Sequence, residues 1–106
     1  MKKEAFCIVD TESRSRTPID RGPANYFADP DAGLICLSYQ IVSRTKAGFT
    51  AGKLKTVWLD GQALPAALPA ELKNFAGQFV AHNWFFEWSA FKRFAPKTFL
   101  ADLSRW

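Results

Sequence analysis

A short apolar run near the start of the chain limits the possible folds more than any other feature. The run Ala5–Asp10 (AFCIVD) holds five apolar residues in succession and ends in a carboxylate. Such a run is typical of a central strand that is buried on both faces of a sheet. We therefore expect a sheet built around this strand, with Asp10 emerging at the sheet edge.

Three further segments predict strands because they combine β-branched or aromatic residues with flanking turn residues. They are Leu34–Val42, Thr56–Leu59 and Gln78–His82. Between the first two of these, Ser43–Lys55 contains Gly48 and Gly52 and predicts the flexible tip of a hairpin, which Thr56–Leu59 then closes.

The segment Ser13–Gly33 follows the first strand and shows neither a helical nor a strand period. It holds three prolines and two glycines, which favour a long loop. Loops of this length in compact domains are usually functional or disordered. The aromatic pair Tyr26 and Phe27 indicates that part of this loop packs against the core.

Two helices are expected in the second half of the chain. A short one lies between prolines, with Gly77 as its cap; its inner side is predicted to carry Leu68, Leu72, Phe75 and Ala76. An aromatic helix then runs from Trp84 to about Phe94, after Asn83 at the N-cap position. Pro96 ends that helix.

These elements predict an α/β domain with a mixed sheet. The first three strands are antiparallel, a crossover helix leads to a parallel fourth strand, and helices flank the faces of the sheet. With 106 residues, the chain is long enough for one domain, 1–106, and too short for a second core.

Charge and cysteine usage limit the partners and the compartment. The net charge is +4, which favours anionic partners. No apolar run reaches the roughly 18 residues of a membrane span, and the start lacks the apolar core of a signal peptide. Cys7 and Cys36 lie in strand-like runs and are expected to be free buried thiols, so we expect a cytoplasmic protein without a membrane partner.

The predicted hairpin tip is the most basic segment of the chain. It contains four cations and no acid: Arg44, Lys46, Lys53 and Lys55. Two interpretations remain open. The cations could be a solvated turn that protects a sheet edge from aggregation, or they could contact phosphates.

Two groups of polar residues are candidates for chemistry. Asp10 and Glu12 lie two residues apart, so a strand directs both carboxylates to one side, where they could share a cation. Asn83 and Glu87 lie one helical turn apart at the start of the aromatic helix. If the fourth strand is parallel to the first and adjacent, three carboxylates converge and suit magnesium or manganese. Alternatively, Glu87 could stand in the first turn only because the helix dipole favours a negative charge there.

Together these groups resemble the 3′–5′ exonucleases of the DEDD class, which have an RNase H-like fold. The likeness covers nearly the whole chain in the same order, in particular with the proofreading exonuclease domain of phage and bacterial family-A DNA polymerases. The residues that carry it are Val9-Asp10-Thr11-Glu12-Ser13-Arg14, Asp20-Arg21-Gly22, Tyr26, Asp29-Pro30, Leu34-Ile35-Cys36-Leu37-Ser38-Tyr39 and His82-Asn83-x-x-Phe86-Glu87.

The resemblance implies a mechanism with two magnesium or manganese ions, about 3.5–4 Å apart, that hydrolyses phosphodiesters at DNA 3′ ends during proofreading in DNA replication. Asp10 would bridge both ions, Glu12 would bind the one that holds the attacking water, and Glu87 would stand where many relatives carry Asp. The implied setting is a bacterial or phage-infected cell, with a polymerase domain in the same longer protein.

The resemblance also implies contacts with a single-stranded or frayed 3′ end. The residues expected to bind nucleic acid are Asn83, Phe86, Thr11, Arg14, Arg44 and Lys46. Phe86, Trp84 or Phe85 could stack on the terminal base. Alternatively, the helix's aromatic residues form core, because Trp84, Trp88 and Phe91 recur at helical spacing.

One motif of the class is missing. It consists of a Tyr or His four residues before a last metal-binding Asp, but Thr98 stands four residues before Asp102, the only late carboxylate. We therefore expect a domain that is incomplete at its C-terminus and whose activity alone is reduced. The alternative is a non-catalytic module that binds nucleic acid or a partner protein through its basic hairpin.

Overall fold

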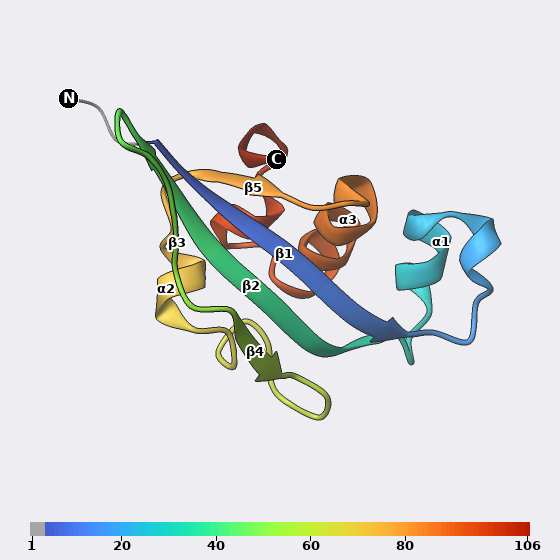
Figure 1. Cartoon of the computed structure of the whole chain (residues 1–106). Coiled ribbons are helices and arrows are strands. Elements are labelled where there is room, and N and C mark those ends of the chain that lie inside the picture. Colours follow the sequence, from blue (N-terminus) through green and yellow to red (C-terminus); the bar gives the residue numbers. More distant parts are fainter. Residues whose placement is uncertain (1–3) are drawn as a thin grey trace.

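The central strand of the sheet is β1 (Glu4–Arg14), which has a strand partner on each side. The computed structural model describes residues 4–106, and Figure 1 shows β1 and the long β2 (Gly33–Thr45) side by side. β2 pairs with β1 in antiparallel orientation, and β5 (Gln78–Val80) pairs with its other side in parallel. The expected α/β class with a mixed sheet and a parallel last strand is confirmed.

The outer edge of β2 carries two short strands, one after the other. β3 (Gly48–Ala51) closes the hairpin with β2, and β4 (Lys55–Trp58) pairs with β2 further along. Between them, the Gly52 N–H donates to the Ile41 carbonyl at 2.8 Å. The predicted third strand at Thr56–Leu59 is confirmed as β4, which pairs with β2 in antiparallel orientation and begins one residue earlier. The predicted flexible tip over Ser43–Lys55 is wrong, because β2 continues to Thr45 and β3 forms a ladder with it.

The prediction that the first strand is buried on both faces and ends at Asp10 is also wrong. Alternate residues Cys7, Val9 and Thr11 are buried, whereas Ile8 is 46% exposed and Asp10 is exposed too. Helices cover only one face of the sheet around β1, which leaves the other face open to solvent (Figure 1). The strand continues because its pairing with β2 extends to Arg14, past an irregularity after Glu12.

Three helices and three short 3₁₀ segments complete the fold of residues 4–106. The helix α3 (Trp84–Phe94) has the predicted bounds, whereas α2 (Ala70–Lys73) is a single turn. The predicted loop Ser13–Gly33 contains a helix, α1 (Pro23–Ala28), and its Tyr26 and Phe27 are buried as expected. The 3₁₀ segments are Ile19–Arg21, Phe99–Ala101 and Leu103–Arg105. Within residues 4–106, none of the helices combines the length and apolar character needed to cross a membrane.

The core lies between the sheet and the helices. Its largest fully buried side chains include Phe79 of β5 and Phe91 of α3, and Trp106 packs against both rings. Cys7 and Cys36 are free thiols, as predicted; Cys7 is fully buried and Cys36 partly so. Burial raises the pKa of the Cys7 thiol to about 12, so this thiol is an inert part of the core.

Gly77 is required by a close approach of two backbone segments. A Cβ at this position would lie 2.3 Å from the Ala5 carbonyl oxygen and 2.5 Å from the Phe75 ring. The prediction of Gly77 as a helix cap is wrong, because α2 ends earlier, at Lys73, with Asn74 as its C-cap. Ala76, expected on the inner side, is exposed.

We expect Gly77→Ala to lower the free energy of unfolding by about 1–3 kcal/mol, because the new methyl group must displace β1 backbone. Urea denaturation followed by circular dichroism measures this change. Ala76→Ser, at the exposed neighbouring position, serves as the control and should stay within about 0.5 kcal/mol of the parent protein. Equal stability of the two variants would contradict the close approach of Gly77 to the Ala5 carbonyl oxygen.

Candidate functional site

The edge of β1 that pairs with β5 has no strand partner beyond Ile8, which is where the predicted carboxylates lie. The last pair between β1 and β5 joins Ile8 to Val80, so Asp10, Thr11 and Glu12 have no strand partner on that side. The chain leaves β5 there and enters α3 at Trp84. The parallel crossover therefore brings the first turn of α3 next to the end of β1.

Glu87 fills this position. Its side chain is 5% exposed, and its Oε2 accepts a hydrogen bond from the Thr11 hydroxyl. The Thr11 backbone also acts on this carboxyl group and lowers its pKa. A carboxyl group from α3 is thus held against β1 at the residue between Asp10 and Glu12.

The environment of Glu87 favours its neutral form. Burial is the main cause and raises the pKa of this carboxyl group to about 7. The hydrogen bonds from Thr11 act in the opposite direction and lower the pKa, while the negative charges of Asp10 and Glu12 raise it further. The three carboxyl groups are therefore electrostatically coupled, as expected of neighbours with like charge.

Asp10 and Glu12 lie on the opposite side of β1 from Thr11. Both are exposed on the open face of the sheet, across from Ser38 and Cys36 of β2. Among residues 4–106, no three His, Cys, Asp or Glu side chains are arranged closely enough to hold a metal ion. The predicted triad is thus brought to one region, but Glu87 is directed towards Thr11 rather than towards the other two carboxylates.

The other residues expected at the start of α3 have different surroundings. Asn83 occupies the N-cap position, where its carbonyl accepts the Glu87 N–H at 3.2 Å, but its side chain makes no capping hydrogen bond. Phe86 packs against Tyr26 and Phe27 of α1, with ring centroids 5.4 and 4.9 Å away. Phe86 therefore joins α3 to α1.

Of the aromatic residues expected at helical spacing in the core, only Phe91 is fully buried. Trp84 and Phe85 are 45% and 46% exposed, and Trp88 is half-buried. The exposed pair lies in the first turn of α3.

The basic residues predicted to bind nucleic acid do not gather around the carboxylates. The Arg14 guanidinium pairs with Asp60 at 3.0 Å and donates to the Asp31 carbonyl at 2.5 Å. Arg44 lies across from Glu4, and Lys46 is in the turn beyond it. This turn is more than about 20 Å from Asp10 along the sheet.

Sequence reasoning used Asp29 only as part of the resemblance and missed that this residue is buried and organises the segment between β1 and β2. Its carboxylate accepts the Arg16 backbone N–H at 2.6 Å and pairs with the Arg16 guanidinium at 3.0 Å. These bonds hold the pKa of Asp29 far below its usual range. The alternation of Arg and Asp in this segment was the available signal, since opposite charges there can pair.

Comparisons of this chain with models of protein families, with curated proteins and with solved structures find no match. The site must therefore be interpreted from its own geometry and chemistry.

We expect Glu87→Gln to remove a pH dependence of stability. The pKa of Glu87 is raised from 4.5 to about 7 in the folded protein, so its stabilising contribution is complete below pH 4.5 and is lost as pH rises through about 7. In EDTA at pH 8, the variant should be more stable than the parent by about 1–3 kcal/mol, and at pH 4 similar to it. Urea denaturation across this pH range tests the prediction.

Glu71→Gln is the matched control for this measurement. The Lys55 ammonium and the Tyr39 hydroxyl lower the pKa of Glu71, so its contribution is present above pH 4.5 and is lost in acid. The control should retain the fall in stability between pH 5 and 8. If both variants retain it, Glu87 is not the group responsible.

Proposed function

We propose that this chain belongs to a metal-dependent 3′–5′ exonuclease domain that acts on DNA 3′ ends, as in the proofreading domain of a family-A DNA polymerase. The supporting observation is that α3 carries Glu87 to Thr11, between Asp10 and Glu12 on the free edge of β1. Thr11 and Glu87, which are 76 positions apart in the chain, are thus in contact, and this supports the proposal.

The donor chemistry fits a hard divalent cation. Asp10, Glu12 and Glu87 offer only oxygen ligands, and their coupled negative charges favour a bound cation. These three residues would hold magnesium or manganese, which would activate water and stabilise the departing 3′ oxygen. Exposure of Asp10 and Glu12 on the open face leaves them accessible to a phosphodiester.

The remaining residues of the site position the carboxylates and the strand end. Thr11 fixes Glu87 through its hydroxyl, and Asn83 starts the helix that carries it. Trp84 presents exposed aromatic surface to the bases of a frayed end. Phe86 and Arg14, which make contacts within the fold, keep α3 and the loop after β1 in place.

We expect Asp10→Asn to reduce removal of nucleotides from a 5′-labelled DNA single strand by more than about 100-fold, because it removes a metal-ligating carboxylate. The assay uses magnesium or manganese and resolves products on denaturing gels. Glu4→Gln, an exposed acid at the other end of β1, is the control and should retain the parent's rate. Shortening that is equal in both variants would contradict the proposal.

Metal binding provides a measurement that does not depend on activity. Manganese should raise the unfolding temperature of the parent protein and of Glu4→Gln, and this rise should be lost in Asp10→Asn. If manganese has no effect on the parent protein and no nucleotides are released, the proposal fails.

A second function is supported by the hairpin of β2 and β3. Its exposed cations Lys46 and Lys53 have no ion-pair partner within residues 4–106, whereas Lys55 pairs with Glu71 at 2.5 Å. Two exposed cations along the outer edge of the sheet, one in the turn between β2 and β3 and one just after β3, suit a non-catalytic module that binds nucleic acid phosphates.

If this second function holds, Lys46→Ala combined with Lys53→Ala should weaken binding of single-stranded DNA and reduce the slope of log affinity against log salt by about 1–2. Fluorescence anisotropy at several salt concentrations measures both quantities. Lys73→Ala combined with Lys97→Ala removes the same charge elsewhere and should have a smaller effect. An equal loss in both pairs would indicate general charge attraction rather than a hairpin site.

A further inference from the structure

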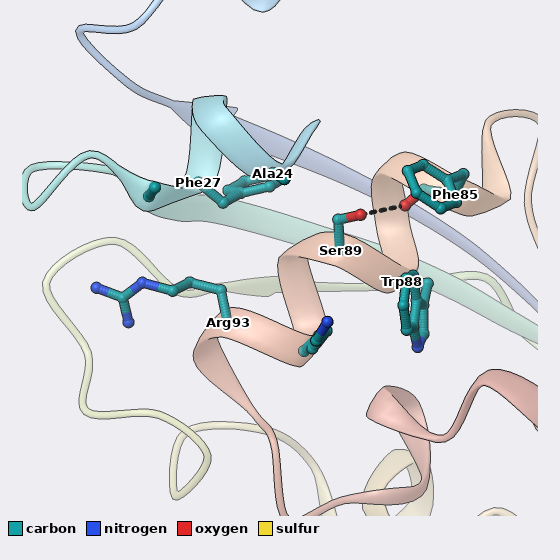
Figure 2. Close-up of a pocket in the computed structure, with 8 residues that line it drawn as sticks. Ala24, Phe27, Phe85, Trp88, Ser89 and Arg93 are labelled. Carbon is teal, nitrogen blue, oxygen red and sulfur yellow. Dashed lines mark hydrogen bonds between the residues drawn. The ribbon is translucent and has the colours of Figure 1, made fainter. Parts of the chain in front are cut away.

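A groove of about 550 Å³ lies between α1 and α3 (Figure 2), and none of Asp10, Glu12 and Glu87 lines it. One wall comes from α1, with Phe27 and the small residues Ala24 and Ala28. The other comes from α3, with Phe85 and Trp88. The two helices are joined below the groove by the contacts of Phe27 with other core rings, so the groove is a formed feature of the fold.

The inner part of this groove offers no free hydrogen-bonding side chain. The Ser89 hydroxyl donates to the Phe85 carbonyl at 2.7 Å, as Figure 2 shows. The Trp88 Nε1–H donates to the Ala101 carbonyl at 2.9 Å. An occupant therefore gains most by inserting an apolar side chain, because polar groups placed there would lose water without finding partners.

Two cations from α3 complete the lining. Lys92 and Arg93 are exposed, and neither has a carboxylate within ion-pair distance among residues 4–106. No acidic residue lines the groove. Arg14, Arg16 and Lys55, by contrast, all pair with acids. The groove thus combines an apolar interior with uncompensated positive charge.

We propose that this groove binds an acidic peptide segment of a partner protein, which inserts a large apolar side chain between the helices. Its carboxylates face Lys92 and Arg93. Both parts of this ligand follow from the lining, because an apolar anchor covers the exposed Phe85 edge and flanking acids supply the missing countercharge.

The aromatic side chains favour a peptide over single-stranded nucleic acid. Stacking of a base requires an accessible ring face. The Lys92 Nζ lies over the Trp88 ring at 5.1 Å from its centroid, and Phe85 packs against Trp88 with centroids 5.6 Å apart. Phe85 also meets Trp84 edge to face. The faces of the Phe85 and Trp88 rings are thus partly covered by neighbouring groups. Their edges remain available for contact with an aliphatic or aromatic side chain of a peptide.

The test uses a short fluorescein-labelled peptide in which one phenylalanine and one leucine are flanked by aspartates. Fluorescence anisotropy measures its binding to the full chain in EDTA, so that the result does not depend on metal or on nuclease activity. We expect Lys92→Glu combined with Arg93→Glu to weaken binding by at least about tenfold, because it removes the attracting charges. Ala24→Trp, at an exposed position, should weaken it similarly by filling the groove.

The matched control is Lys46→Glu combined with Lys53→Glu, which changes the net charge equally on the distant hairpin. It should weaken peptide binding less than threefold, and Asp10→Asn should leave binding unchanged. Circular dichroism checks that each variant is folded. A peptide with glycine in place of phenylalanine and leucine should bind at least about tenfold more weakly than the original.

Three results would overturn the proposal. The first is no binding of the acidic peptide at millimolar concentration. The second is equal loss of binding in the groove variants and the hairpin control, which would indicate general charge attraction. The third is that oligothymidylate displaces the peptide and loses its own binding in Ala24→Trp, which would make the groove a nucleic-acid site.

Discussion

The alternation of side chains along β1 between a helix-covered and an open face determines the arrangement of the site. Because period two directs Val9 and Thr11 to the helices, Asp10 and Glu12 must face solvent. Thr11 is then the β1 residue available to a carboxyl group from α3, and Glu87 bonds to it. The alternation of side chains along β1 thus determines that Asp10 and Glu12 are exposed to solvent and that Glu87 is buried.

The sequence predicted the elements with strong local signals. The Trp84–Phe94 helix has an N-cap position before it and a proline after it, and its bounds agree with the structure. The parallel pairing of the last strand followed from the crossover, which also brought Glu87 near Asp10. Proximity of the carboxylates was therefore predictable, because it depends only on strand order and on the helix that follows.

Other features depend on contacts that are distant in the chain and have no local signal. An apolar run such as residues 5–10 does not reveal whether one or both faces of its sheet are covered, so the exposure of Ile8 was not expected. Glycine at position 77 is explained by the nearby Ala5 carbonyl rather than by a helix end. The direction of the Glu87 carboxyl group was equally hidden, since it depends on the hydroxyl of Thr11.

Helix geometry separates the carboxylate region from the groove between α1 and α3. At 100° per residue, Glu87, Ala90 and Phe91 lie on the buried side of α3, whereas Phe85, Ser89 and Lys92 lie about 180° away. A ligand in the groove therefore contacts α3 on the side that does not touch β1. Ala90 and Phe91 are fully buried, so they hold α3 against the core between the carboxylate region and the groove. The same helix can thus present one carboxyl group to a strand and an independent surface to a partner.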